Sequence, residues 1–99
     1  MIIVWSAEAR RALRAIHKFI AQDSEFYADR MVARIIERVE RASTAPGQGH
    51  PVHEYPDEQL KEVHESPYRI IYACSDEEFR VVTIAHFKQR HTRKRLTSR

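Results

Sequence analysis

The sequence predicts an α+β fold in which an N-terminal strand and an antiparallel helix hairpin pack on a small, mainly antiparallel sheet. Three observations predict it: an apolar run at residues 2–5, helical apolar stripes between residues 7 and 42, and strand-like segments in the second half. The 99 residues are enough for one small domain with a modest core. We therefore expect a single domain over residues 1–99.

The segment after the opening run is predicted to form two helices. Residues 7–22 and 25–42 both carry apolar side chains at helical spacing. Ser6 is suited to cap the first helix, and Asp23 or Ser24 the second, because their side-chain oxygens can accept from the first backbone amides. Since the connection is so short, the two helices should be antiparallel neighbours.

The second half of the chain is predicted to contain a loop and three strands. Residues 43–58 hold three of the four prolines and both glycines, which indicates a loop. Strands are expected at residues 59–65, 68–74 and 79–87, and the last two are rich in aromatic and β-branched residues. The four residues 75–78 fit a hairpin loop between them.

The register of this hairpin decides which side chains share a face. We assume that Cys74 pairs with Phe79, a register that a β-bulge would change. Arg69 is then opposite Ile84 and a diagonal neighbour of His86. The residues expected in the core are Trp5, Leu13, Ile16, Ile20, Met31, Ile35, Val39, Ile71, Val82 and Ile84.

The other face of the hairpin is also apolar, and two short helices can cover only one face of the sheet. We expect the second face to remain exposed as a partner site. Its residues are Tyr68, Ile70, Tyr72, Phe79 and Val81. The alternative is that the loop at residues 43–58 folds over this face.

Charged residues are segregated along the chain. Residues 51–78 carry eight acidic and two basic side chains, whereas residues 79–99 carry seven basic and no acidic ones. The basic end, with a tail at about residues 88–99, suits nucleic acid, an acidic protein or the chain's own middle segment as a partner.

Several protein classes are disfavoured by composition. One cysteine gives no internal disulfide, and no apolar run approaches the length of a membrane helix, so we expect a soluble cytoplasmic protein without membrane association. There is no cofactor motif, and His50, His53 and His64 do not have the spacing of metal ligands. No cofactor and no metal are expected.

Five short motifs follow one another along residues 3–90. They are Val4-Trp5-Ser6-x-x-Ala9, Leu13-x-x-Ile16-x-x-x-Ile20-Ala21-x-Asp23-Ser24, Pro46-x-x-Gly49-x-x-Val52-x-Glu54, Leu60-x-Glu62-Val63 and Tyr68-Arg69-Ile70-Ile71-Tyr72. In this order they resemble the RelE/ParE superfamily of toxins from bacterial type II toxin–antitoxin modules. The residues of these motifs resemble ParE-type members more closely than RelE-type members.

The resemblance implies a cognate antitoxin, encoded alongside, that occupies the exposed apolar surface of the toxin. In the register assumed above, that surface is the hairpin face that carries Tyr68, Ile70, Tyr72, Phe79 and Val81. A ParE-like toxin would inhibit DNA gyrase and would have no known catalytic residues. The candidate target-binding residues are Arg69, His86, Lys88, Arg90 and Arg93.

Two alternatives remain at this point. A RelE-like toxin would cleave messenger RNA on the ribosome, a reaction that needs a base, an acid and cations near the phosphate. Arg69, His86 and Lys88 would supply these functions. The segment before strand 68–74 is acidic, however, and its carboxylates would repel a phosphate backbone; they belong to Glu54, Asp57, Glu58 and Glu62. Arg69 could instead have a purely structural role, an intramolecular ion pair with Glu62 or another strand carboxylate. The further alternative is a non-toxic binding scaffold.

Overall fold

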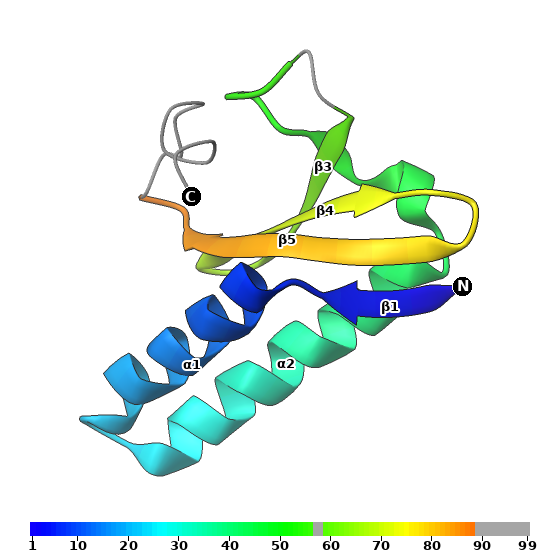
Figure 1. Cartoon of the computed structure of the whole chain (residues 1–99). Coiled ribbons are helices and arrows are strands. Elements are labelled where there is room, and N and C mark those ends of the chain that lie inside the picture. Colours follow the sequence, from blue (N-terminus) through cyan, green and yellow to red (C-terminus); the bar gives the residue numbers. More distant parts are fainter. Residues whose placement is uncertain (57–58, 89–99) are drawn as a thin grey trace.

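The computed structural model of the chain describes residues 1–56 and 59–88. The elements are β1 (Ile2–Trp5), α1 (Ala7–Ala21), α2 (Glu25–Ser43), the 3-10 helix η1 (Pro46–Gln48), β2 (His50–Pro51), β3 (Leu60–Glu65), β4 (Tyr68–Cys74) and β5 (Glu78–His86). The five strands form one sheet in the order β1-β5-β4-β3-β2, in which only the β1–β5 pair is parallel. The predicted fold class is confirmed (Figure 1).

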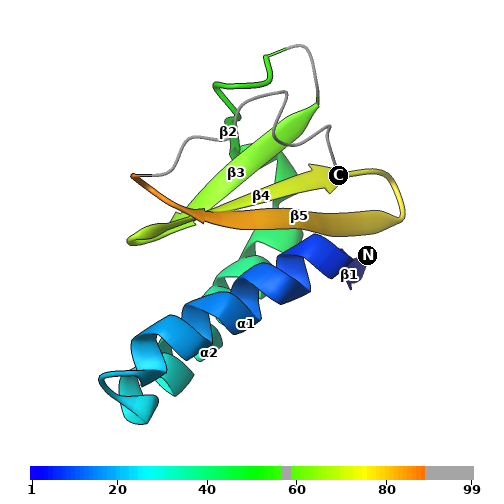
Figure 2. The ribbon, with the colours of Figure 1, turned by 60° about the vertical axis from the view of Figure 1, so that its left-hand side comes forward.

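The helix hairpin forms where the sequence predicts it. The Ser6 hydroxyl accepts a hydrogen bond of 2.9 Å from the Ala9 amide and so caps α1. The Ser24 hydroxyl accepts from the Tyr27 amide at 3.2 Å, so Ser24 rather than Asp23 caps α2. The two helices run antiparallel along one face of the sheet (Figure 2). Neither helix, nor any other in the described residues, is long and apolar enough to cross a membrane.

The main core lies between the helices and the sheet. Its buried residues are Ala9, Ile35, Val39, Ala42, Val63, Tyr68, Ile70, Tyr72, Phe79, Val81 and Ile84. All five residues predicted to form an exposed partner face are therefore in the core, each at most 7% exposed, and that prediction is wrong. The helices present the small side chains of Ala9 and Ala42 to this face, which leaves room for the aromatic rings.

The β4–β5 register changes at a β-bulge. Cys74 pairs with Phe79 as predicted, but beyond Tyr72 the partners shift by one residue. Arg69 is therefore opposite Ala85, whereas Ile84 and His86 turn toward the helices. The predicted pairing of Arg69 with Ile84 and its diagonal contact with His86 are both wrong, because an inserted residue reverses which side chains share a face.

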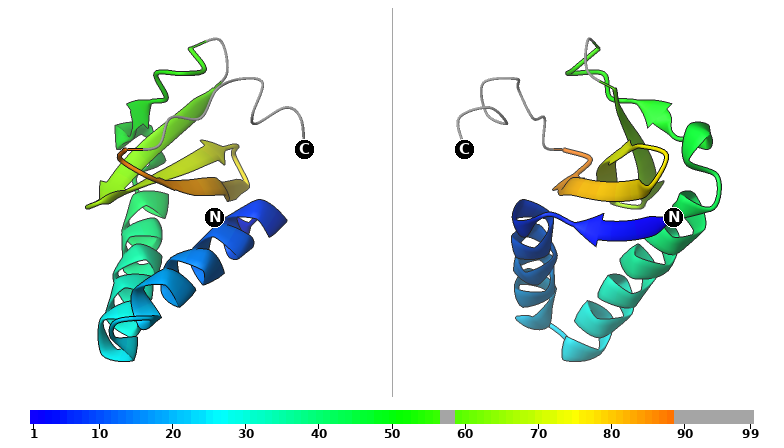
Figure 3. Two further views of the ribbon diagram at one scale, coloured as in Figure 1. Left: turned by 90° about the vertical axis from the view of Figure 1, so that its left-hand side faces the viewer. Right: turned by 45° about the vertical axis from the view of Figure 1, so that its right-hand side comes forward.

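Residues 49–55, which we call the strap, form the edge strand β2 beside β3 and then pack on part of the sheet face away from the helices (Figure 3). Val52 and Tyr55 are each 1% exposed and form a second small core with Ile71. The Tyr72 hydroxyl donates a hydrogen bond to the Pro46 carbonyl just before the strap begins. The loop does fold over one face of the hairpin, but it is the face of Ile71; the face for which this alternative was stated is covered by the helices.

Candidate functional site

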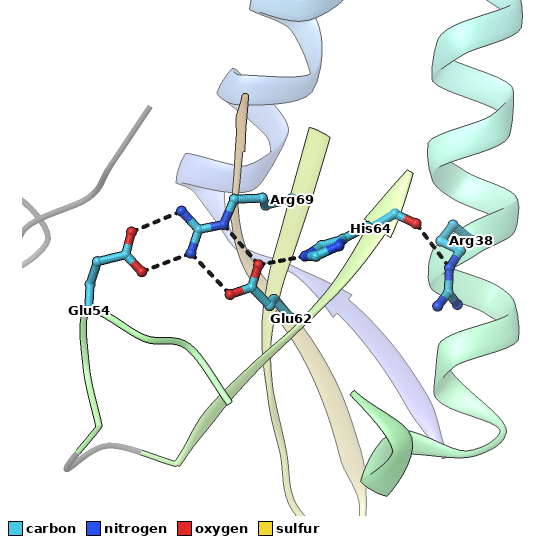
Figure 4. Close-up of polar contacts among 5 residues, drawn as sticks. All are labelled: Arg38, Glu54, Glu62, His64 and Arg69. Carbon is cyan, nitrogen blue, oxygen red and sulfur yellow. Dashed lines mark hydrogen bonds and ion pairs between the residues drawn. The ribbon is translucent and has the colours of Figure 1, made fainter. Parts of the chain in front are cut away.

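Arg69 is the centre of a buried ionic cluster on the strap side of the sheet. Its Nε and Nη2 atoms donate to the two carboxylate oxygens of Glu62 at 2.8 and 3.0 Å. Its Nη1 and Nη2 atoms donate to those of Glu54 at 2.9 and 2.8 Å. Figure 4 shows the guanidinium held between the two carboxylates. Such bidentate, charge-assisted pairs fix both orientation and distance.

Three different segments bring these groups together. Arg69 lies on β4 opposite His64 of β3, and Glu62 is two residues from His64, so all three side chains point to the same face. Glu54 arrives from the strap, between the buried residues Val52 and Tyr55. The cluster therefore fastens the strap to the sheet.

Both partners of the Arg69–Glu62 pair are buried, at 8% and 7% exposure. Burial acts to raise the pKa of Glu62, but hydrogen bonds and charges from Arg69 and His64 outweigh it and lower that pKa below its usual range. Hydrogen bonds from its guanidinium to Glu54 and Glu62 raise the pKa of Arg69 further above its already high ordinary value. Both groups therefore stay charged around neutral pH.

The network continues from the strap side to helix α2. His64 Nε2 lies 2.8 Å from Glu62 Oε1, on the side of the carboxylate away from Glu54. The backbone carbonyl of His64 accepts a hydrogen bond of 3.2 Å from Arg38 Nε on α2. One chain of polar contacts thus joins the strap, β4, β3 and α2 (Figure 4).

A pocket of about 520 Å³ opens beside the cluster. It is lined by His53, Glu54, Glu62, His64, Arg69 and Phe87. The four hydrogen bonds to Glu54 and Glu62 use four of the five N–H groups of a guanidinium. The Arg69 side chain is therefore occupied by intramolecular ion pairs, which is the structural alternative stated from the sequence. Among residues 1–56 and 59–88, no three His, Cys, Asp or Glu side chains are arranged to hold a metal ion.

His86, another predicted site residue, lies on the opposite face of the sheet from Arg69. The His86 ring packs edge-on against Tyr68, with 5.6 Å between ring centroids, on the helix side of the sheet. Its Nδ1 accepts a 3.0 Å hydrogen bond from the backbone amide of Lys88, whose residue is exposed. Arg90 and Arg93 lie outside the described residues.

Sequence reasoning missed two contributors to this site. In the sequence, Glu54 belongs to the third motif and to an acidic segment that would repel RNA, and His64 is one of three histidines without metal spacing. Neither observation predicts a contact with the Arg69–Glu62 pair. The alternation of β3 puts Glu62 and His64 on one face, so this signal was available for His64. No comparable local signal exists for Glu54, because its position depends on the path of the strap.

Comparisons with known proteins identify one family model and two structures of similar fold. The family model for the ParE toxin of type II toxin–antitoxin systems (parDE) matches residues 3–91. The structure is similar to one from the chromosomal ParDE system of P. aeruginosa, with a TM-score of 0.75 and 19% identity over 87% of this chain and 95% of that one. It is also similar to one from the RelBE2 toxin–antitoxin complex of Mycobacterium tuberculosis, with a TM-score of 0.65 and 19% identity over 86% and 95%.

These two structural likenesses concern the fold. Among curated protein sequences, none matches the chain. The match of the family model covers nearly the whole chain, and it agrees with the resemblance found in the five sequence motifs. The chain therefore belongs to the ParE toxin family of the RelE/ParE superfamily.

Proposed function

We propose that the protein inhibits DNA gyrase in the cytoplasm, without a cofactor or metal, and is neutralised by a cognate antitoxin encoded alongside it. The observation that carries this proposal is the match of the ParE toxin model over residues 3–91. In this proposal the toxin stops an essential enzyme by binding to it, which requires no catalytic group on the toxin itself.

The ionic cluster supports this proposal over RNA cleavage. An endoribonuclease needs cations directed at a phosphate and a nearby acid or base. Here Arg69 is bound by two carboxylates, and His86 packs on the opposite side of the sheet. Arg69 and His86, two of the three residues suggested for a RelE-like reaction, thus do not share one site.

We assign Arg69 the role of holding the strap, and we place the target contact at the basic end of the chain. Lys88 is exposed just after β5, and the sequence continues with Arg90 and Arg93. Basic side chains of this kind suit an acidic surface on a partner.

The test is a supercoiling assay with purified gyrase, run beside translating ribosomes that carry a defined message. We expect loss of supercoiling or trapped cleaved DNA, with the message intact, and recovery when the antitoxin is added. Cleavage of the message with gyrase unaffected would contradict the proposal and support the RelE-like alternative. A folded sample that is inactive in both assays would support the scaffold alternative.

A second experiment tests the target contact. The triple variant Lys88→Ala, Arg90→Ala, Arg93→Ala should need a higher concentration than the wild type for half-inhibition of gyrase. The matched control is Arg11→Ala, Arg14→Ala, Lys18→Ala, which removes the same charge from exposed positions on α1. Equal weakening by both triple variants would show a general charge effect and would contradict the assignment.

A further inference from the structure

Strand β5 ends at His86, and the next two residues, Phe87 and Lys88, form a turn at the start of the basic end of the chain (Figure 1). The backbone amide of Phe87 donates a 2.8 Å hydrogen bond to the carbonyl of Pro67, in the turn between β3 and β4. Bonding to the sheet thus continues one residue beyond β5. The chain leaves the regular strand pairing within this turn, directly before the exposed side chain of Lys88.

The side chains of His86 and Phe87 hold the turn from opposite faces of the sheet. On the helix side, the His86 ring meets the buried Tyr68 ring at an angle of 85° between the ring planes. On the strap side, the Phe87 ring meets the His64 ring edge to face, with 5.0 Å between the ring centroids. Such edge-to-face pairs are favourable beyond the area that they bury. The turn is therefore clamped against both β3 and β4.

A third contact fixes the backbone of the turn itself. It is the 3.0 Å hydrogen bond that the Lys88 amide donates to His86 Nδ1. In a neutral imidazole the accepting nitrogen carries no proton, so this bond requires the tautomer of His86 with its hydrogen on Nε2. Asn and Asp stabilise turns in the same way, by accepting from the amide two residues further along the chain. His86 performs this task with a ring nitrogen.

We propose that His86 is a positioning residue for the target contact, which fixes the place and direction in which Lys88 is presented to gyrase. The inference rests on the proposed function and assigns to it a residue that acts through the turn. Binding by a chain that must first be ordered costs conformational entropy. A turn that is already held by His86 reduces this cost, as preorganisation does in other interfaces.

The packing of the His86 ring disfavours a direct contact between this residue and the target. The ring lies against Tyr68 on the helix side of the sheet, whereas Phe87 and Lys88 are both exposed. If His86 acts through the turn, any side chain that accepts from the Lys88 amide at the same place should replace it. That substitution is the basis of the test.

Two variants separate the accepting atom from the ring. His86→Asn keeps an acceptor, because the amide oxygen of Asn is attached to the same side-chain atom as Nδ1 of His, but it has no ring. His86→Phe keeps a ring against Tyr68 but has no acceptor. In the gyrase supercoiling assay, His86→Phe should raise the half-inhibitory concentration by about fivefold, the size of effect expected for one hydrogen bond. His86→Asn should stay within about twofold of the wild type.

A merely structural role of His86 predicts the opposite order, because ring packing would then decide the effect. Melting temperatures measured on the same samples reveal that packing: His86→Asn should melt below both His86→Phe and the wild type, although it inhibits gyrase better than His86→Phe. The matched control is His17→Phe, the same substitution at a half-exposed histidine of α1. It should leave the half-inhibitory concentration within about twofold of the wild type.

The exchange of the Lys88 amide hydrogen with water, measured by nuclear magnetic resonance, tests the held turn without gyrase. Exchange should be about fivefold faster in His86→Phe than in the wild type and His86→Asn. Equal exchange in all three proteins would overturn the inference, because the bond to Nδ1 would then hold nothing in solution.

The gyrase assay separates failure of the inference from failure of the proposed function. If the wild type inhibits gyrase but His86→Phe inhibits equally well, or His86→Asn is as weak as His86→Phe, the positioning role is wrong and the proposed function stands. If the wild type leaves gyrase active, the proposed function fails, and the role of His86 in it fails as well, whatever the exchange rates are.

Discussion

The Ser6 hydroxyl donates a hydrogen bond of 2.7 Å to the backbone carbonyl of Val82, 76 residues away in the sequence. Val82 is the residue that the β-bulge inserts between the pairs of Val81 and Thr83 with β4. The same hydroxyl accepts from the Ala9 amide and so begins α1. One side chain therefore caps a helix and satisfies the carbonyl of a residue outside the regular strand pairing.

Ser6→Ala should lower the free energy of unfolding by about 2 kcal/mol, because it removes a helix cap and leaves a partly buried carbonyl without this donor. Urea denaturation measures the change. The matched control is Ser24→Ala, which removes only the exposed cap of α2 and should cost about 0.5–1 kcal/mol. Equal losses in the two variants would show that the bond to Val82 adds nothing.

The bulge also shows where prediction from sequence ends. The turn at residues 75–78 and the pairing of Cys74 with Phe79 follow from local residue types, and both are observed. The shift beyond Tyr72 does not follow from them, because the inserted residue is supported by Ser6 from the other end of the chain. Only the tertiary contact reveals that His86 faces the helices.

The sequence also does not determine which face of the β4–β5 hairpin packs against the helices. Both faces of the β4–β5 hairpin are apolar, so the alternation along each strand could not say which face the helices cover. Tyr72 and Val81 became core residues, whereas Ile71 packs under the strap. The Arg69–Glu62 pair was foreseeable from two neighbouring strands, but the contribution of Glu54 required the folded path of the strap.

Arg69→Met should be strongly destabilising, by about 3–5 kcal/mol, since it leaves the carboxylates of Glu54 and Glu62 close together without their guanidinium. That loss is a large part of the about 5–15 kcal/mol that stabilises a typical domain. Chemical denaturation with far-ultraviolet circular dichroism measures it. Arg80→Met is the control: it breaks an exposed pair with Glu78, and its cost should stay below about 1 kcal/mol. A comparable cost in both variants would contradict a special role for the buried cluster.

The stability of the protein should fall in acid partly through Glu62. Since the pKa of Glu62 is lower in the folded protein than its ordinary value of 4.5, its contribution is complete above that value. The contribution is lost as the pH falls through the folded-state pKa. The difference in unfolding free energy between the wild type and Glu62→Gln should therefore be constant near neutral pH and shrink below about pH 4.5. Parallel curves for the two proteins down to about pH 3 would contradict this role of the carboxylate.

The strap offers a test of packing that involves no charge. The position of a Cβ at residue 49 would overlap the Tyr72 hydroxyl and ring, whereas nothing lies within 4 Å of such an atom at residue 47. The Tyr72 ring cannot easily move away, because it is stacked on Phe79 at 4.3 Å between centroids and its hydroxyl bonds the Pro46 carbonyl. Gly49→Ala should therefore cost about 1–3 kcal/mol through overpacking. Gly47→Ala should stay within about 0.5 kcal/mol of the wild type, as expected for a surface change. Thermal unfolding of the two variants decides the matter, and equal melting temperatures would mean that the strap does not press against Tyr72 in solution.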